Sequence, residues 1–172
     1  MARLKVAIVG AGPAGLMLAR LLHISGQSIE FTVFESDRGP TARSQGSTLD
    51  LHPATGLAAL KQANLWTEFQ QHVRYDGESI KFVDKHYRIY VDRSNTGEEA
   101  NSNGRPEIDR VKLKEILLHS IPNDSIQWGR RLEDIEASDR TWTLIFKDGS
   151  AETGFDQIVG ADGAFLAFDP RS

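Results

Sequence analysis

Residues 4–35, LKVAIVGAGPAGLMLARLLHISGQSIEFTVFE, decide the fold of this chain. An apolar, β-branched run at 4–9 predicts a strand, and the glycine-rich turn 10–15 leads into a helical stretch at 16–22. A second β-rich run, 29–34, ends on Glu35, which lies 20 positions after the last glycine of the turn. A GxGxxG turn between a strand and a helix, followed by an acid at the end of the next strand, predicts a βαβ unit that binds a dinucleotide.

Each residue of the turn has a physical role in this interpretation. Gly10 permits a tight turn, Gly12 lets the backbone approach a pyrophosphate, and Gly15 lets the helix pack against the strand. Pro13 suits the first turn of a helix. The helix that begins with Pro13 and Ala14 has an N-terminus that favours binding of phosphates. Glu35 is placed to accept hydrogen bonds from an adenosine ribose. The alternative is a glycine-rich turn in an ordinary α/β domain.

Composition places the chain among ordinary globular proteins and excludes several functions. Its 172 residues are 40% hydrophobic and 26% charged, enough for a sizeable core, and the net charge of −4 disfavours a nucleic-acid partner. The absence of cysteine excludes disulfides and thiol nucleophiles, and the five histidines form no HxH or HExxH pattern, so no metal is expected. No segment is long and apolar enough to predict a membrane span, and we expect a cytoplasmic protein.

Beyond Glu35 the chain departs from a simple dehydrogenase-type nucleotide domain. A polar loop at 36–47 replaces the next helix, and the regular pattern returns only with a helix that Asp109 is placed to cap. The remaining expected elements are helices at 53–63 and 65–73, a hairpin at 79–83 and 87–91, a strand at 126–128, a three-stranded meander at 131–136, 142–146 and 151–153, and a strand at 155–159. The layout is a βαβ unit, a long excursion, and a return to a parallel sheet.

Four motifs in this order carry a family resemblance along nearly the whole chain. They are GAGPAGLMLARLL with Glu35, ARSQGSTLDLH at 42–52, RPEIDRVKL at 105–113 and VGADGA at 159–164. With them the chain resembles the N-terminal half of class A flavoprotein monooxygenases, the aromatic-ring hydroxylase group, and looks closest to the tetracycline-inactivating branch.

The resemblance implies an α/β fold with a Rossmann-like, FAD-binding parallel sheet, covered by helices, and a partial inserted β-rich substrate domain. The implied domains are 1–73 with 105–172 for FAD and 74–104 for the substrate-domain insertion. Arg43 would lie near the flavin and the nicotinamide cofactor, Asp50 near the flavin, and Arg110 against FAD. Asp162-Gly163 would serve the pyrophosphates of FAD and NADPH.

Other interpretations of these residues stay open. Arg43 could be a surface arginine, Asp50 could cap a turn before Pro53, and Arg110 could pair with Glu107. No side chain stands out as a general acid or base, so the catalytic residues are not assigned. Trp142 and Phe146 are expected in the core of a strand.

By resemblance the function is FAD-dependent monooxygenation, in which NADPH or NADH reduces the flavin and dioxygen then hydroxylates a small organic substrate. The family's serine and arginine do not follow Gly163, and its second FAD motif is absent. We therefore expect about the first half of such an enzyme, inactive by itself. The alternatives are a catalytically inactive FAD- or nucleotide-binding fragment and a non-oxygenating FAD or NAD oxidoreductase.

Overall fold

A computed structural model describes residues 3–42, 46–75, 80–93, 106–138 and 140–163. The chain forms two compact units. The sheet unit comprises residues 1–45 and 114–172, and the central unit comprises residues 46–113. These bounds differ from the domain bounds expected at 73/74 and 104/105, and the assignment of 74–104 to a substrate domain stays a prediction.

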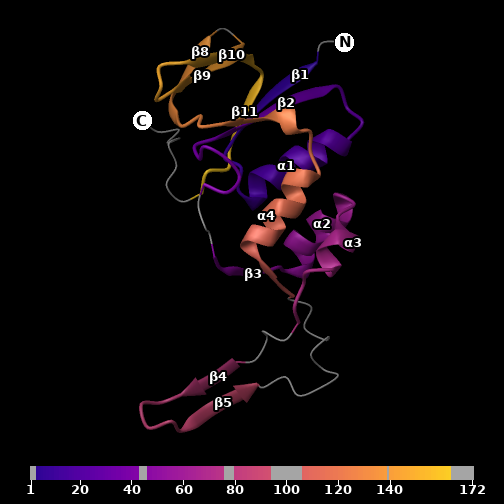
Figure 1. Ribbon diagram of the computed structural model, residues 1–172, viewed down its shortest axis with the longest axis vertical. Helices are drawn as coiled ribbons and strands as arrows, with labels where there is room; N and C mark the ends of the chain where they lie inside the picture. Colours follow the sequence, from indigo (N-terminus) through magenta and orange to yellow (C-terminus); the bar gives the residue numbers. More distant parts are fainter. Residues whose placement is uncertain (1–2, 43–45, 76–79, 94–105, 139, 164–172) are drawn as a thin grey trace. The chain divides into compact units, whose positions relative to one another are not determined.

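The sheet unit is built on a parallel sheet of order β11-β1-β2-β7 (Figure 1). Its strands are β1 (Leu4–Val9), β2 (Ile29–Glu35), β7 (Ile126–Trp128) and β11 (Gln157–Gly160), and all three pairings are parallel. Helix α1 (Pro13–Ile24) connects β1 to β2. The predicted βαβ unit and the parallel α/β sheet are confirmed. The last strand begins two residues later than expected because Phe155 ends the strand before it.

Hydrophobic residues cover both faces of this sheet. Ile8 and Val33 are fully buried on the face where α1 packs with Leu16. Ala7, Val9 and Phe34 point to the other face and join one hydrophobic cluster with the meander, as the alternation of side chains along a strand requires.

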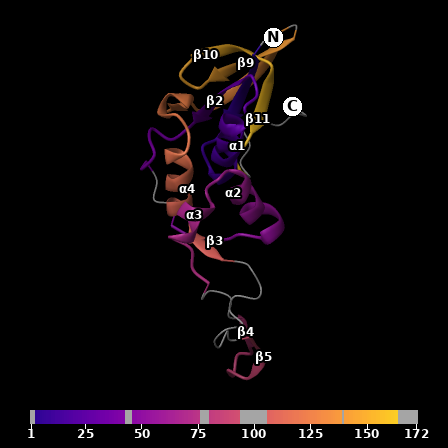
Figure 2. The same ribbon diagram turned by 90° about the vertical axis from the view of Figure 1, so that its right-hand side faces the viewer.

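The meander is an antiparallel sheet of order β10-β9-β8, seen beside the parallel sheet in Figure 2. Its strands are β8 (Leu132–Ser138), β9 (Thr141–Phe146) and β10 (Ala151–Phe155). The Phe34 ring lies 5.1 Å from the Phe146 ring and 5.8 Å from the Phe155 ring, centroid to centroid. This aromatic core fixes the meander on the sheet. Phe146 is buried as predicted, whereas Trp142 is 40% exposed, so its expected core position is wrong.

The central unit contains short elements and a pairing that the sequence did not predict. Strand β3 (Thr48–Asp50) pairs antiparallel with β6 (Glu107–Asp109), directly before helix α4 (Arg110–His119). The sequence predicts only the approach to a helix in this stretch, whereas the structure forms β6 there. Next to β6, the Pro106 carbonyl accepts a hydrogen bond from Leu51 N–H at 3.1 Å. Asp109 caps α4 as predicted, since its Oδ1 accepts from Val111 N–H at 2.8 Å.

The helices of the central unit are shorter than expected. The first begins with a π-helical turn (Pro53–Leu57), in which the His52 carbonyl accepts from Leu57 N–H at 3.2 Å, and continues as α2 (Ala58–Gln62). Helix α3 covers only Trp66–Gln70, and a 3₁₀ turn (Asn123–Ser125) precedes β7 in the sheet unit.

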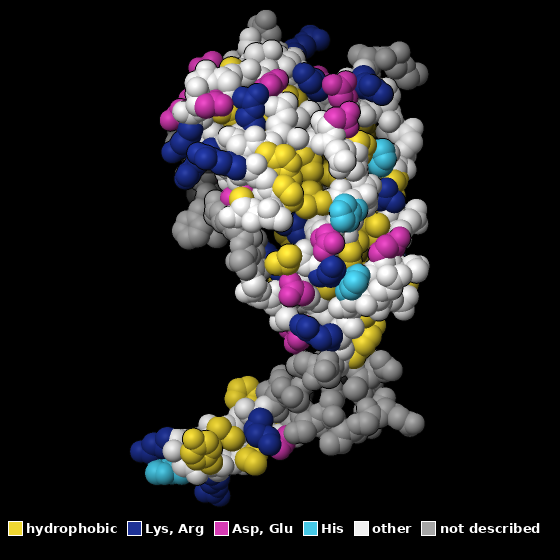
Figure 3. Space-filling model, viewed as in Figure 1, with side chains coloured by type: hydrophobic (Ala, Val, Ile, Leu, Met, Phe, Trp, Pro, Cys, Tyr) yellow, Lys and Arg dark blue, Asp and Glu magenta, His cyan; other side chains and the backbone are white. Residues whose placement is uncertain are grey.

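A hairpin of β4 (Ile80–Val83) and β5 (Ile89–Arg93) is present as expected. Hydrophobic side chains lie beside lysine and arginine side chains on its surface (Figure 3), and Phe82, Tyr87 and Tyr90 are more than half exposed.

Candidate functional site

The glycine turn follows the end of β1 and contacts the ends of β2 and β11, the two strands that neighbour β1. Gly10 has φ of +111°, and its N–H donates to the Phe34 carbonyl at 2.8 Å. A Cβ on Gly10 would stand 2.6 Å from the Ala161 carbonyl oxygen, and Ala161 N–H donates to the Val9 carbonyl at 2.7 Å. The turn therefore needs glycine here for both its conformation and its space.

The other two glycines of the turn differ in what surrounds them. A Cβ on Gly15 would stand 2.1 Å from the Gly10 carbonyl oxygen, so close packing of helix and strand requires glycine there. A Cβ on Gly12 would meet only the Ala161 carbonyl oxygen, at 3.8 Å, which is an ordinary contact. Because Gly12 also has φ of −75° and ψ of 174°, the described chain does not itself require glycine at this position.

The N-terminus of α1 opens beside this turn. Gly12 is its N-cap, no side chain in the described part of the chain caps it, and Pro13 is the first helical residue. Leu16 N–H donates to the Gly12 carbonyl at 3.0 Å, while the first-turn amides that precede it have no acceptor within the helix. Ala14 in this turn is exposed. The bare end of a 12-residue helix favours an anion, so the turn fits the pyrophosphate of a dinucleotide.

Glu35 ends β2 and connects directly to the turn. Its Oε2 accepts from Ala11 N–H at 2.6 Å, and its Oε1 accepts from Ser36 Oγ and Asp37 N–H, both at 3.0 Å. Burial raises the pKa of this carboxyl, but the three hydrogen bonds and the charge of Lys114 outweigh it, so the pKa lies below its ordinary value. A carboxylate offers about four acceptor positions, so an ionised Glu35 keeps room for a ribose hydroxyl.

The predicted motif at 159–164 lies at the same edge of the sheet. Asp162 and Gly163 directly follow Ala161, which packs against Gly10, and Gly163 has φ of +88°. The structure thus brings Gly10, Gly12, Asp162 and Gly163 together, although they are far apart in the sequence.

Two predicted residues lie in the central unit. Arg110 N–H donates to the Ser47 carbonyl at 2.9 Å, while its Nε is buried and has no hydrogen-bond partner in the described part of the chain. Within that part no ion pair joins Arg110 to Glu107, so the alternative pairing is not found. A buried guanidinium nitrogen without an acceptor suits a ligand oxygen.

Asp50 is exposed on β3, opposite Glu107. The turn before Pro53 is capped by His52, whose Nδ1 accepts from Ala54 N–H at 3.3 Å, rather than by Asp50. Arg43 lies outside the described residues.

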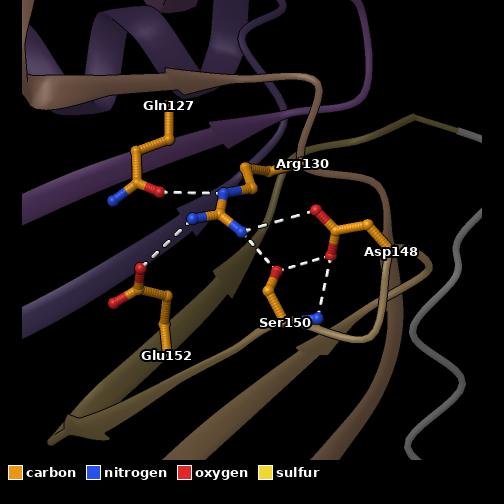
Figure 4. A network of polar contacts seen from close by, with 5 residues as sticks. All are labelled: Gln127, Arg130, Asp148, Ser150 and Glu152. Carbon is orange, nitrogen blue, oxygen red and sulfur yellow. Dashed lines mark hydrogen bonds and ion pairs between the residues drawn. The ribbon is translucent and has the colours of Figure 1, made fainter.

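Sequence reasoning missed a polar network centred on Arg130 (Figure 4), whose N–H donates to the Glu35 carbonyl at 2.8 Å. Arg130 Nε donates to Gln127 Oε1 at 3.0 Å, and its Nη atoms contact Ser150 Oγ, Asp148 Oδ2 at 3.6 Å and Glu152 Oε1 at 3.5 Å. The guanidinium charge is thus matched by two carboxylates, which ties β7 to the meander. Arg130 is accordingly a structural residue and not a candidate phosphate ligand.

A lysine and a tryptophan near Glu35 were missed as well. Lys114 Nζ lies 5.8 Å from the centroid of the Trp128 ring. Lys114 stands four residues after Arg110 on α4, a helical spacing that could have been noticed in the sequence.

In the described ranges no cluster of His, Asp and Glu side chains suits a metal ion. No helix in those ranges is both long and apolar enough to cross a membrane.

A parallel βαβ unit with this glycine turn and a terminal acid defines a dinucleotide-binding domain. Comparison with protein families is more specific, since the model of a family described as FAD binding domain matches residues 3–165. The chain belongs to this family, and the family's description gives FAD as the cofactor of the site.

Known proteins support the same assignment. The chain is 37% identical over 175 residues to monooxygenase asqM of Emericella nidulans, a match that covers 94% of this chain and 38% of that protein. A crystal structure described as an FAD-containing monooxygenase from Photorhabdus luminescens is 29% identical, with a TM-score of 0.71 over 93% of this chain and 39% of that one. The tetracycline destructase Tet(55) is 21% identical and shares the fold, with a TM-score of 0.72 over 98% of this chain and 42% of that one. The chain therefore spans about two fifths of the length of these three proteins.

Proposed function

We propose that this chain supplies the FAD-binding part of an FAD-dependent monooxygenase that takes electrons from NADPH or NADH and uses dioxygen to hydroxylate a small organic substrate. Bound FAD would supply the electron transfer and the reaction with dioxygen. Support comes from the family match and from the relatives that carry the name monooxygenase. NAD(P)H is supplied inside the cell, and within the cell we propose the cytoplasm as the location of the protein.

One observation carries the proposal at the level of residues. Gly10 and Gly15 are explained by contacts within the chain, whereas Gly12 is not, since among the described residues an added Cβ would meet nothing closer than 3.8 Å. Gly12 stands at the uncapped N-terminus of α1, where a pyrophosphate oxygen has to come close to the backbone. The fold does not require glycine at position 12, but a bound phosphate would. Gly12 therefore favours a phosphate-binding site at this turn.

The other site residues receive their roles from this placement. In the proposal Pro13, Ala14 and Gly15 form the first helical turn against the pyrophosphate, and Glu35 accepts from the adenosine ribose. Asp162 and Gly163 extend the pyrophosphate site from the adjacent strand end.

Further cofactor contacts are proposed for three residues outside the glycine turn. Arg110 would donate its buried Nε to FAD. Asp50 and Arg43 would lie near the flavin, and residues 74–104 would belong to the part that receives the substrate.

The proposal is tested by adding FAD to the purified protein and following flavin fluorescence, then adding NADPH or NADH without oxygen and following the visible flavin band. Binding of FAD, bleaching by one reductant and substrate-dependent oxygen uptake are expected of the monooxygenase that contains this chain. FAD binding without bleaching would favour a nucleotide-binding module, and bleaching without oxygen transfer to any substrate would favour a non-oxygenating oxidoreductase. Absence of FAD binding would refute the proposal.

A further inference from the structure

Trp128 is fixed directly beside Glu35 at the edge of the parallel sheet. The Cα atoms of the two residues are register partners in the β2–β7 pairing. Two backbone hydrogen bonds continue the pairing past the strand ends, from Arg130 N–H to the Glu35 carbonyl and from Gly129 N–H to the Asp37 carbonyl, both at 2.8 Å. Neighbours in parallel register direct their side chains to the same face, so the indole lies on the Glu35 side of the sheet.

Lys114 completes this arrangement from α4. Its Nζ lies 5.8 Å from the centroid of the Trp128 ring, within the range of a cation–π contact. The described residues include no carboxylate within ion-pair distance of Lys114, whereas Arg130 is neutralised by Asp148 and Glu152. Lys114 therefore keeps its charge available beside Glu35.

We propose that Trp128 and Lys114 form one wall of the adenosine half of the dinucleotide site, in which the indole holds the lysine and the lysine positions the Glu35 carboxylate for the ribose hydroxyls. The inference rests on the proposed function, because it presupposes that an adenosine diphosphate group occupies the site. Lys114 is a positioning residue in this account, since it acts on the ligand through Glu35.

A positive charge beside Glu35 is useful because this acid has to share the site with an anionic ligand. Glu35 has to be ionised to accept strongly, yet an ionised carboxylate near a pyrophosphate repels it. Three hydrogen bonds to Glu35 come from neutral donors, Ala11 N–H, Ser36 Oγ–H and Asp37 N–H, and these offset no net charge. The ammonium of Lys114 offsets the charge of Glu35 and lets one site hold both an acid and an anionic ligand.

The central unit offers a matched control. Lys61 Nζ lies 4.7 Å from the centroid of the Trp66 ring, a contact of the same kind and of shorter distance. Loss of Lys61 should change stability about as much as loss of Lys114, without any effect on an adenosine site.

The test measures ADP binding to the full chain by calorimetry, with urea unfolding of every variant. Lys114→Met should weaken ADP binding about fivefold, as expected for a partly exposed charge interaction, and Lys114→Arg should stay within about twofold of the parent. Trp128→Phe should weaken binding by less than Lys114→Met, because phenylalanine keeps a poorer cation–π surface. Lys61→Met should bind ADP as the parent chain does.

A double-mutant cycle with Glu35→Gln separates positioning from direct contact. If Lys114 acts through Glu35, Lys114→Met has little further effect on ADP affinity once residue 35 is neutral. An equal loss in both backgrounds would overturn the positioning role. Unchanged ADP affinity in both Lys114→Met and Trp128→Phe would overturn the whole inference while leaving the nucleotide site intact. Failure of the parent chain to bind ADP would instead overturn the proposed function.

Discussion

Replacing Gly12 by alanine should weaken nucleotide binding about tenfold or more while leaving the fold intact. The added Cβ would lie 3.8 Å from its nearest neighbour in the chain, and the backbone conformation suits any residue. Alanine is a poorer N-cap than glycine, so the free energy of unfolding should fall by no more than about 1 kcal/mol. A methyl group at the N-terminus of α1 would hold phosphate oxygens away from the first-turn amides. The loss of one charge-assisted hydrogen bond corresponds to about a tenfold or larger loss of ADP affinity.

The same substitution at Gly15 should have the opposite outcome. There the Cβ would lie 2.1 Å from the carbonyl oxygen of Gly10, a backbone atom that cannot move without displacing the turn. Overpacking of this kind costs about 3 kcal/mol or more, a large part of the stability of an ordinary domain. Gly15→Ala is therefore expected to unfold at much lower urea concentration than the parent chain.

Urea unfolding followed by circular dichroism and ADP titration by calorimetry test both variants side by side. The reasoning about Gly12 is refuted if Gly12→Ala binds ADP with parental affinity, since no phosphate then approaches this backbone. It is equally refuted if Gly12→Ala is as destabilised as Gly15→Ala, since the position would then be needed for packing.

Four further predictions concern charge and core packing. Glu35→Ala should weaken FAD or ADP binding by about 1–3 kcal/mol by calorimetry, and equal affinities would remove Glu35 from the site. The pKa of Glu35 in the folded chain lies below its ordinary value of 4.5, so the ionised carboxylate stabilises the fold above pH 4.5. This stabilisation is lost as the pH falls through the folded-state pKa. Glu35→Gln should therefore lose less stability than the parent chain between about pH 7 and pH 3, measured by urea unfolding. Arg110→Ala should weaken FAD binding or slow flavin reduction by NADPH, because the buried Nε of Arg110 is assigned to the cofactor. The control Arg131→Ala, at an exposed arginine, should change neither. Equal FAD affinities and equal reduction rates in the two variants would exclude Arg110 as a cofactor residue. Phe146→Ala should lower the free energy of unfolding by about 3–5 kcal/mol, because it empties the contact with Phe34, and a change below 1 kcal/mol would contradict the described core.

The parts of the fold that could be predicted are those specified by neighbouring residues. β1, the glycine turn, α1 and β2 follow from local patterns, and each was predicted within a few residues of its observed bounds. β6 was missed because it depends on pairing with β3, far away in the sequence, and because its three residues carry no strand pattern of their own. Trp142 was misplaced because the pattern of β9 marks a strand without telling which residues the meander buries.

The same distinction applies to the candidate site. The spacing of Gly10, Gly12 and Glu35 predicts a nucleotide turn, yet the bond from Ala11 N–H to Glu35 could not be predicted because it depends on side-chain conformation in the folded state. The contact of Lys114 with Trp128 was beyond sequence reasoning as well, since it requires knowing where α4 packs against the sheet.

The position of β1 in the middle of the parallel sheet has a consequence for how the chain folds. β1 pairs with β2 through a short connection, but its other edge is completed only by β11, which lies near the other end of the described chain. Contacts so distant in sequence form slowly, and until they form β1 exposes an unpaired edge to other chains. Ala161, which packs against Gly10, arrives together with β11. The nucleotide turn is thus complete only when β11 has docked, so ADP binding reports that docking and not the formation of the N-terminal βαβ unit alone.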